Sequence, residues 1–228
     1  MIKKFFSTSK NTFTKNILCL GKTDLENPNI YNFSIPEIVS FFTNLSSSQV
    51  YFLNQEHDTK FHYVPQDFLE PPVGDALFTD KKNIALVIKT ADCIPLFFWS
   101  KSKDWIGLIH SGWRGTAKGI TQKVISYIQN KFNIFDLEFF MGPCIRQNNY
   151  EVGRDVAFQF KHIPETLIPL ENNKFLFSND LAVQIQLRQI CPTSNLEDCR
   201  ICNYSDPNYY SYRRGDKERN LNIIWMSE

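Results

Sequence analysis

The stretch NIALVIKTADCIPLFFWSKSKDWIGLI, from Asn83 to Ile109, decides the fold that we expect for this chain. It contains three short apolar runs with polar residues between them. Runs of this length that are rich in β-branched and aromatic residues are typical of buried strands. Pro95 lies in the second run and cannot donate a backbone hydrogen bond, so that run is expected at a sheet edge or a bend. The three predicted strands are 83–89, 93–99 and 105–109.

The residues that follow predict a helix between two strands. Apolar residues recur at helical spacing over 120–132, and Thr116 is the candidate cap for the start of that helix. A fourth strand is expected at 137–141 and a second helix at 179–190, with Ser178 or Asn179 as its cap. Strand–strand neighbours occur beside a β-α-β unit. This order favours a mixed-sheet α/β or α+β fold over a pure doubly wound sheet.

The size and charge of the chain bound its class. At 228 residues, with 43% hydrophobic and 21% charged residues, the chain fits one domain spanning residues 1–228. Its 25 basic and 24 acidic residues give a formal charge of +1, so we expect no nucleic-acid partner. No apolar run reaches the length of a membrane span, so we expect no membrane partner either.

The N-terminus has only part of the pattern of a signal peptide. Met1 to Ser7 resembles a charged first region, but Thr8 to Lys15 is polar where an apolar region would follow. We therefore expect no signal peptide and a cytoplasmic protein.

The six cysteines do not form the dense disulfide framework of a small secreted domain, so most are expected to be reduced and buried. Cys199-Arg-Ile-Cys202 is a lone CxxC motif with no second pair, which argues against a four-cysteine zinc ribbon. We expect two half-buried thiols in a loop. Redox or metal use of the pair is the less favoured alternative.

Two histidines and one cysteine form a candidate metal site. Cys93 and His110 each stand beside a predicted strand end, and the sixteen residues between them allow one strand to turn and the next to return alongside. Their side chains can therefore converge on one sheet edge, to which a polar loop would have to deliver His57. Three nitrogen or sulfur ligands are the number that a catalytic zinc uses while its fourth position stays open.

Residues next to this candidate site suggest that it binds an anion. Gly112-Trp-Arg-Gly115 precedes the predicted helix, where free N–H groups favour an anion. Arg114 adds a guanidinium suited to phosphate or carboxylate. Asp92, beside Cys93, is a candidate proton carrier or a partner that orients a histidine ligand.

A second basic cluster lies near the C-terminus. Arg213 and Arg214 are adjacent, and Arg219 follows closely. These arginines either line the same pocket or form a solvated charged face.

Four motifs in a fixed order give a more specific expectation. They are Thr90-Ala-Asp-Cys93, His110-Ser-Gly-Trp-Arg-Gly115, Gly142-Pro-Cys-Ile145 with Tyr150-Glu-Val-Gly153, and Tyr210-Ser-Tyr-Arg-Arg214. Together they resemble the laccase-domain family, long labelled multicopper polyphenol oxidases and since described as purine nucleoside phosphorylases with adenosine deaminase activity. The resemblance is clearest from about residue 51 to residue 228.

This resemblance implies a fold, a metal site and a reaction. The implied fold is a single-domain layered α/β/β/α sandwich with mixed β-sheets. The implied reaction is zinc-dependent phosphorolysis of adenosine-, inosine- or guanosine-type nucleosides to base and ribose 1-phosphate, accompanied by adenosine deamination. The partners would be a purine nucleoside and phosphate, and the protein a monomer or homodimer. The site residues expected on these grounds are His57, Cys93 and His110 for zinc, Asp92 and Arg114 for catalysis, and Arg114, Arg213 and Arg214 for phosphate.

The chain departs from the family pattern at a few positions. The departures are Asp58 where a glycine usually follows the first histidine, Ser111 for an alanine, and Glu218 for a glycine before Arg219. A glycine after the first histidine would let the backbone approach the metal closely. Asp75 and Thr79 match a family segment, and we expect them to support the pocket structurally.

Three other functions use the same residues. Cys93 as nucleophile and His110 as its base would give an amide hydrolase, for instance one that edits cell-wall precursors. A structural zinc would need a fourth ligand, for which His62 is the nearby candidate. A copper-dependent polyphenol oxidase needs several imidazoles beyond a blue-copper site, and the chain has four histidines. Copper is therefore less favoured than zinc.

Overall fold

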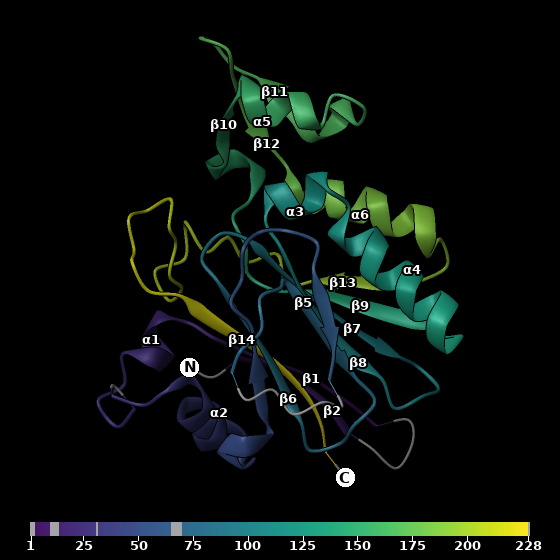
Figure 1. The fold of residues 1–228 in the computed structure, drawn as a ribbon. Helices are drawn as coiled ribbons and strands as arrows, with labels where there is room; N and C mark the ends of the chain where they lie inside the picture. Colours follow the sequence, from purple (N-terminus) through teal and green to yellow (C-terminus); the bar gives the residue numbers. More distant parts are fainter. Residues whose placement is uncertain (1–2, 10–13, 31, 65–69, 228) are drawn as a thin grey trace.

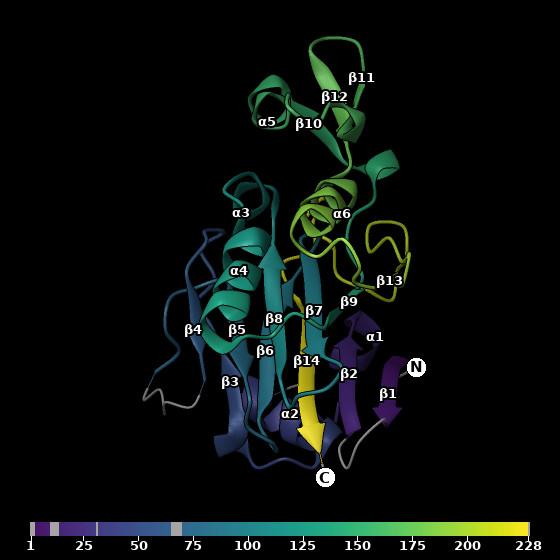
Figure 2. The same cartoon turned by 90° about the vertical axis from the view of Figure 1, so that its right-hand side faces the viewer.

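The computed structural model describes residues 3–9, 14–30, 32–64 and 70–227. Two mixed β-sheets pack face to face, and helices cover both outer faces (Figures 1 and 2). Part of the N-terminal stretch considered as a leader, residues 1–2 and 10–13, lies outside the described residues, whereas 3–9 forms a strand.

The first main sheet has five strands. Their spatial order is β1 (Lys3–Ser9), β2 (Thr14–Leu20), β14 (Asn220–Ser227), β6 (Ala85–Thr90) and β3 (Val50–Phe52). β3 runs parallel to β6, and the other neighbours are antiparallel. The C-terminal strand thus lies in the middle of the sheet, beside the predicted strand that became β6.

The second main sheet has six strands and includes the other three predicted strands. Their order is β13 (Leu196–Asp198), β9 (Leu137–Met141), β7 (Ile94–Ser100), β8 (Ile106–Ser111), β5 (Ala76–Thr79) and β4 (Phe61–Tyr63). The outer pairs β13–β9 and β5–β4 are parallel, and the inner pairs are antiparallel. Both sheets are therefore mixed, as expected.

The expectation that Pro95 marks an edge or a bend is wrong, because β7 lies between β8 and β9. Pro95 is the second residue of β7 and lies opposite His110. Its carbonyl accepts a hydrogen bond from the backbone N–H of Gly142, just beyond the end of β9. The missing N–H therefore costs the sheet a bond only at its end, where a proline is tolerated.

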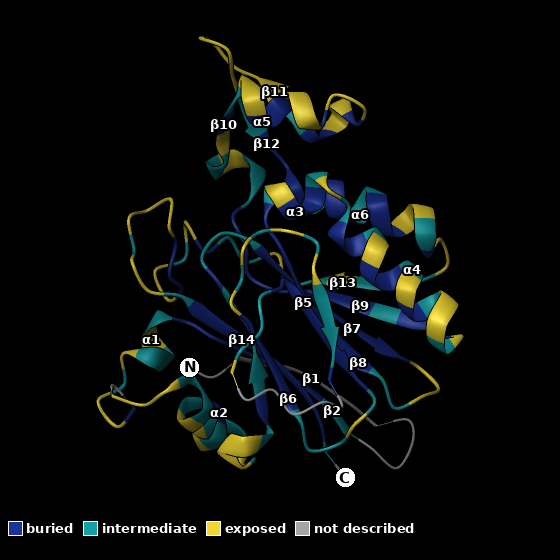
Figure 3. Ribbon diagram, in the orientation of Figure 1, coloured by how far each residue is buried: buried dark blue, intermediate teal, exposed yellow. Residues whose placement is uncertain are grey.

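The burial pattern confirms the α/β/β/α order of layers (Figure 3). Along β7, Phe97 and Trp99 point into the cluster between the two sheets, whereas Leu96 and Phe98 point toward α4 (Ile120–Phe132) and α6 (Asn179–Ile190). On the far side of the five-stranded sheet, α2 (Ile35–Thr43) covers a third cluster through its buried Val39. The alternating side chains of a strand thus serve two separate cores.

Both predicted helices form, α6 with both predicted ends and α4 over the apolar repeat 120–132, but the start of α4 lies later than a cap at Thr116 implies. Ser178 caps α6 by accepting a hydrogen bond from the backbone N–H of Leu181. Thr116 does not cap α4, because it lies inside the short helix α3 (Trp113–Ala117) and bonds to the carbonyl of Gly112. Gly119, with φ of 74°, supplies the left-handed residue that separates the two helices. Figure 2 shows β8 leading directly into α3.

A small antiparallel sheet stands apart from the two main sheets (Figures 1 and 2). Its strand order is β10 (Glu151–Gly153), β12 (Lys174–Phe177) and β11 (Leu167–Pro169), and α5 (Arg154–Gln159) packs on it. The remaining short helices are α1 (Lys22–Leu25), η1 (Ser47–Gln49), η2 (Gln147–Asn149) and η3 (Pro164–Thr166). Within the described part of the chain, no helix combines the length and apolar character needed to cross a bilayer.

Candidate metal centre

His57, Cys93 and His110 meet at one end of the six-stranded sheet. His110 lies in β8, Cys93 immediately precedes β7, and His57 lies in the loop between β3 and β4. One nitrogen or sulfur atom from each residue lies within 4.8 Å of those of the other two. The structure thus brings together the three residues that the sequence predicts as ligands. The antiparallel pairing of β7 with β8 is what places Cys93 beside His110.

The buried carboxylate of Asp75 organises both histidines. One of its oxygens accepts a hydrogen bond from Nδ1 of His110 at 2.7 Å and another from the backbone N–H of His57 at 3.0 Å. Its other oxygen accepts from the backbone N–H groups of Glu56 and Asp58. His57 itself is held at φ of 61°, a left-handed conformation that a non-glycine residue rarely adopts. Asp75 therefore fixes the loop that carries one candidate ligand and the ring orientation of the other.

Gly112 makes room for the candidate ligands. A Cβ atom at this position would lie 2.9 Å from Sγ of Cys93 and 3.0 Å from Cδ2 of His57. Contacts this short do not occur for real Cβ atoms, so any other residue would displace a ligand side chain. The glycine in the HSGWRG motif is thus explained by the metal centre.

Cys93 and His110 shift each other's protonation. Burial alone would raise the pKa of the Cys93 thiol, but His110 and His57 lower it to about 6. Burial alone would lower the pKa of His110, but the Cys93 sulfur and the Asp75 carboxylate raise it to about 9. A thiolate and two imidazoles are the donor types that zinc prefers. Because Nδ1 of His110 is occupied by Asp75, Nε2 is the nitrogen available to a metal.

His62 does not belong to this group. His62 lies on β4, and its Nε2 is 2.8 Å from the carbonyl oxygen of Val73. Among the described residues, the candidate metal-binding group comprises only His57, Cys93 and His110. The hypothesis of a structural zinc with His62 as fourth ligand is therefore wrong.

Two departures from the family pattern are accommodated locally. Asp58 keeps its backbone N–H on Asp75, and its exposed carboxylate pairs with Lys118 at 3.0 Å. The hydroxyl of Ser111 is buried and lies 2.8 Å from the hydroxyl of Thr116. Neither side chain enters the metal centre.

A cavity of about 560 Å³ opens from the three candidate ligands. Among the described residues that line it, four carry fixed positive charges and only Asp92 is acidic. The basic residues are Lys89, Arg114, Arg213 and Arg219. This excess of positive charge in a partly closed space favours an anionic ligand.

Each cavity arginine lies over an aromatic ring. Arg114 is 4.4 Å from the ring centre of Trp113, and Arg213 is 5.4 Å from that of Tyr150. Arg219 lies 5.7 Å from that of Tyr212. These rings restrict the guanidinium groups without neutralising them. Sequence reasoning missed Tyr150 and Tyr212 as cavity residues, although both fall in the quoted motifs.

Asp92 ties the C-terminal arginine loop to the metal centre. Its carboxylate accepts hydrogen bonds from the hydroxyl of Ser211 and the backbone N–H of Arg213, both at 2.7 Å. Burial raises the pKa of Asp92, although these two bonds act in the opposite direction. The residue has φ of 87°, so the turn before Cys93 is held in a strained conformation.

The two adjacent arginines serve different purposes. Arg213 lines the cavity and donates to the carbonyl of Glu151 at 2.7 Å. Arg214 points elsewhere: its guanidinium donates to the carbonyls of Asn203, Tyr204 and Tyr209 and to the carboxylate of Asp216. Arg214 thus stabilises the loop between β13 and β14, and Arg219 rather than Arg214 lines the cavity.

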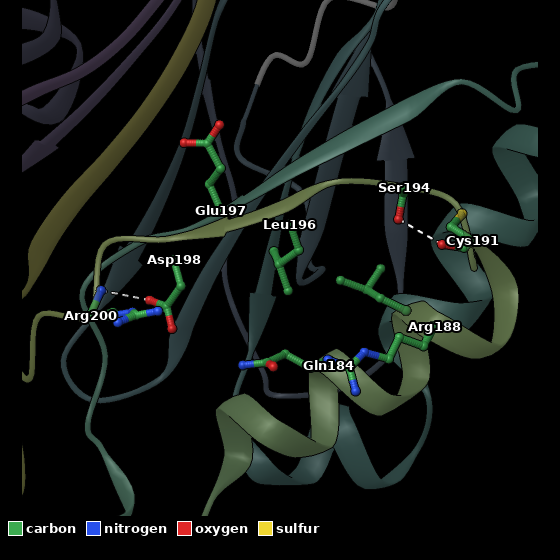
Figure 4. A pocket seen from close by; sticks show the side chains of 9 residues that line it. Gln184, Arg188, Cys191, Ser194, Leu196, Glu197, Asp198 and Arg200 are labelled. Carbon is green, nitrogen blue, oxygen red and sulfur yellow. Dashed lines mark hydrogen bonds between the residues drawn. The ribbon is translucent and has the colours of Figure 1, made fainter.

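A second cavity, of about 670 Å³, lies between α6 and β13 (Figure 4). Arg188 and Arg200 lie on it, but Glu197 and Asp198 offset their charge. None of the candidate metal ligands lines this second cavity, and its cysteine, Cys191, lies without the histidines that surround Cys93. Size alone therefore does not identify the functional site.

The sequence matches one known family along most of its length. The family model described as multi-copper polyphenol oxidoreductase laccase matches residues 36–227. A purine nucleoside phosphorylase from Borreliella burgdorferi is 29% identical over 223 residues, which cover 95% of this chain and 91% of that protein. A purine nucleoside phosphorylase from Aquifex aeolicus is 31% identical over 191 residues, which cover 82% and 88%.

Solved structures share the fold. YlmD from Geobacillus stearothermophilus superposes with a TM-score of 0.82 at 20% identity, over 99% of this chain and all 100% of that one. A Neisseria meningitidis protein superposes with a TM-score of 0.81 at 24% identity, over 100% and 99%. With the family model matching most of the sequence, this chain belongs to the multi-copper polyphenol oxidoreductase laccase family.

Proposed function

We propose that this chain is a zinc-dependent purine nucleoside phosphorylase that also deaminates adenosine. The observation that carries the proposal is the convergence of His57, Cys93 and His110 at the base of a cavity with cationic walls. The names of the relatives from Borreliella burgdorferi and Aquifex aeolicus support the reaction class. The substrates are a purine nucleoside of the adenosine, inosine or guanosine type and phosphate.

Zinc is the metal that we assign to the three candidate ligands. The donor set, one thiolate and two imidazoles, fits zinc and leaves room for a further ligand on the cavity side. Bound zinc would supply Lewis-acid polarisation at the base of the cavity. Copper is the alternative metal, and metal analysis of the purified protein distinguishes the two.

Arg114 and Arg213 are the residues that we assign to phosphate. Both line the cavity, and each is steered by an aromatic ring. Guanidinium groups bind phosphate oxygens in pairs, which orients the anion as well as attracting it. A phosphate held beneath the anomeric carbon offsets the positive charge that develops on the ribose as the purine leaves.

Asp92 has two tasks in this proposal. Its bonds to Ser211 and to the backbone of Arg213 position the arginine loop. Its raised pKa also brings the carboxyl closer to the range in which it exchanges a proton with the leaving base or with the deaminated purine. In both tasks the residue acts from the cavity wall beside Cys93.

The test is a product analysis with quantified metal. Purified zinc-loaded protein is incubated with adenosine and phosphate, and adenine, inosine and ribose 1-phosphate are measured. Phosphorolysis requires that adenine and ribose 1-phosphate form together and only with phosphate present. Absence of all three products at full zinc occupancy would refute the proposal.

A hydrogen-bonded chain of residues supports a second candidate function. Asp75 holds His110, and His110 lowers the pKa of the Cys93 thiol, an arrangement suited to nucleophilic catalysis in an amide hydrolase. Treatment with a chelator separates the two functions. Amide hydrolysis through the thiolate survives metal removal, whereas the zinc-dependent reaction is lost with the metal.

A further inference from the structure

The CxxC motif, which the proposed function does not use, lies against a third cysteine. Cys202 faces Cys144 across an isolated parallel bridge. The bridge is formed by Cys144 N–H to the carbonyl of Ile201 at 3.3 Å and Asn203 N–H to the carbonyl of Cys144 at 3.2 Å. Opposed strands lie about 4.8 Å apart, and disulfides join Cα atoms about 4.4–6.8 Å apart. The backbone therefore already suits a Cys144–Cys202 disulfide, although both thiols are free here.

Hydrogen-bond donors surround the sulfur of Cys202. Its Sγ accepts from the backbone N–H of Arg146 and from Nδ2 of Asn149, both at 3.4 Å. Burial alone would raise the pKa of Cys202, but these donors and Ser205 lower it overall. The residue is only half-buried, so a small oxidant can reach it. A thiolate that is stabilised and accessible is the form that reacts with peroxides.

Cys144 has the opposite character. It is fully buried in the cluster between the six-stranded sheet and its helices, and burial raises the pKa of its thiol well above the ordinary value. Cys199, the other member of the CxxC motif, packs instead against the cluster between the two sheets. Residues opposed in a bridge point to the same side of the strands, so Cys144 rather than Cys199 is aligned with Cys202.

We propose that Cys202 is a peroxide-reactive modification site whose oxidised form is captured by Cys144 as a disulfide. In the first step the Cys202 thiolate attacks a peroxide oxygen, an S–O bond forms, the O–O bond breaks and hydroxide leaves. In the second step the Cys144 sulfur attacks the sulfur of the Cys202 sulfenic acid. An S–S bond forms, the S–O bond breaks, and the departing hydroxide takes the Cys144 proton as water.

The new bond would join two segments that border the metal-centre cavity. On one side, Ile145 donates its backbone N–H to the carbonyl of Asp92 at 3.0 Å. On the other side, the loop that begins after Cys202 carries Arg213. The thiol chemistry itself does not depend on the proposed function.

Peptide mapping after peroxide treatment tests this proposal. The purified protein is treated with a stoichiometric amount of hydrogen peroxide, remaining thiols are alkylated, and linked peptides are identified by mass spectrometry. The expected main product is the Cys144–Cys202 linkage. Cys202→Ser is expected to abolish it, and Cys144→Ala to leave a sulfenic acid on Cys202 that dimedone traps.

Cys191→Ala is the matched control. Cys191 follows the end of α6 and is buried in the same cluster as Cys144, but it is not opposed to Cys202, so its loss is expected to leave the linkage unchanged. A main linkage between Cys199 and Cys202 would overturn the pairing. Cys202 that is still free for alkylation after Cys19, Cys191 or Cys199 has been oxidised would overturn its role as the reactive thiol of this pair. The peptide map of the peroxide-treated protein without substitutions decides both points, even if Cys144→Ala fails to fold.

Discussion

The metal-centre cavity and the second cavity, between α6 and β13, are similar in size, about 560 and 670 Å³. Each contains a cysteine and arginines. They differ in what surrounds those residues. Cys93 lies between two histidines that one buried carboxylate orients, whereas Cys191 lies at the end of α6 and accepts a hydrogen bond from Gln129. Arg114 and Arg213 face one acidic residue in their cavity, whereas Arg188 and Arg200 face two.

The comparison teaches that the convergence of side chains, rather than cavity volume, distinguishes the candidate metal centre. At the candidate metal centre, Asp75 holds the loop of His57 and the ring of His110, and Asp92 beside Cys93 holds the backbone of Arg213. Two of these residues, His57 and Asp92, adopt unfavourable backbone conformations. Such strain persists only where the surrounding contacts maintain it, and it clusters at functional sites. Matched substitutions in the two cavities therefore test the assignment.

The largest difference is expected between Cys93→Ala and Cys191→Ala. Loss of the Cys93 thiolate removes one of three candidate ligands, so zinc content and phosphorolysis are both expected to fall to background. Cys191→Ala is expected to retain both. Metal analysis together with the nucleoside assay measures the contrast, and equal zinc content in the two variants would break it.

The next largest effect is expected from Asp75→Asn. The amide keeps one acceptor oxygen but turns an NH₂ group toward backbone N–H donors, so the loop of His57 and the ring of His110 lose their support. We expect zinc affinity to fall by about 10- to 100-fold, the usual cost of losing a partner that orients a ligand. Competition with a chromogenic chelator measures this loss.

Glu197→Gln, an exposed change at the second cavity, is the control for Asp75→Asn. Like Asp75→Asn, it replaces a carboxylate by an amide and removes one negative charge, but it does not contact the candidate ligands. An unchanged zinc affinity in Asp75→Asn would show that the carboxylate does not hold the metal centre together.

In chelator-treated protein, Cys93 and Cys191 are expected to react with iodoacetamide over different pH ranges. The pKa of Cys93 is lowered to about 6, so its alkylation rate should reach a plateau above about pH 7. Below about pH 6 the rate should fall as the thiolate is protonated. Burial raises the pKa of Cys191, so its rate should still rise beyond pH 9. At pH 7 Cys93 is mostly thiolate and Cys191 mostly thiol, but low-pKa thiolates are intrinsically weaker nucleophiles, so we expect Cys93 to react only about tenfold faster.

Peptide mass spectrometry at several pH values gives both rates in one sample. Cys93 reactivity that rises only above pH 8 would contradict the influence of His110 on the thiol.

The smallest effect is expected from the arginines. Arg114→Ala should raise the KM for phosphate by up to about tenfold, the value of one charge-assisted hydrogen bond at an exposed side chain, with little change in zinc content. Arg188→Ala in the second cavity should leave the KM unchanged. Steady-state kinetics at varied phosphate separate the two, and similar KM values in both variants would remove Arg114 from the phosphate site.

Much of the fold was predictable because local patterns and burial agree. The helix at 179–190 and the strand at 137–141 form with the predicted ends, and the apolar repeat over 120–132 forms a helix, since their apolar periodicity matches the layers that they pack against. Pro95 misled the prediction because its position in the strand, rather than its presence, decides whether a proline is tolerated.

The candidate site was predictable only in part. Cys93 and His110 could be paired because adjacent antiparallel strands join them. Arg214 was assigned to phosphate and Thr116 to a helix cap from residue type and position alone. The folded loop turns Arg214 toward carbonyls of its own segment, and Gly119 separates Thr116 from α4. Tyr150 and Tyr212 approach the cavity from separate loops, for which no periodicity exists.

By itself, the sequence determined the family, the mixed α/β fold class and the residue types of a metal centre, because motif order and hydrophobic period are local properties of a chain. Only the tertiary structure decided that Asp75 holds both histidines, that Gly112 must lack a side chain, and that Arg219 rather than Arg214 reaches the cavity. The first two depend on contacts between residues far apart in sequence, which exist only once the sheets have formed, and the third depends on how the loop before β14 folds on itself.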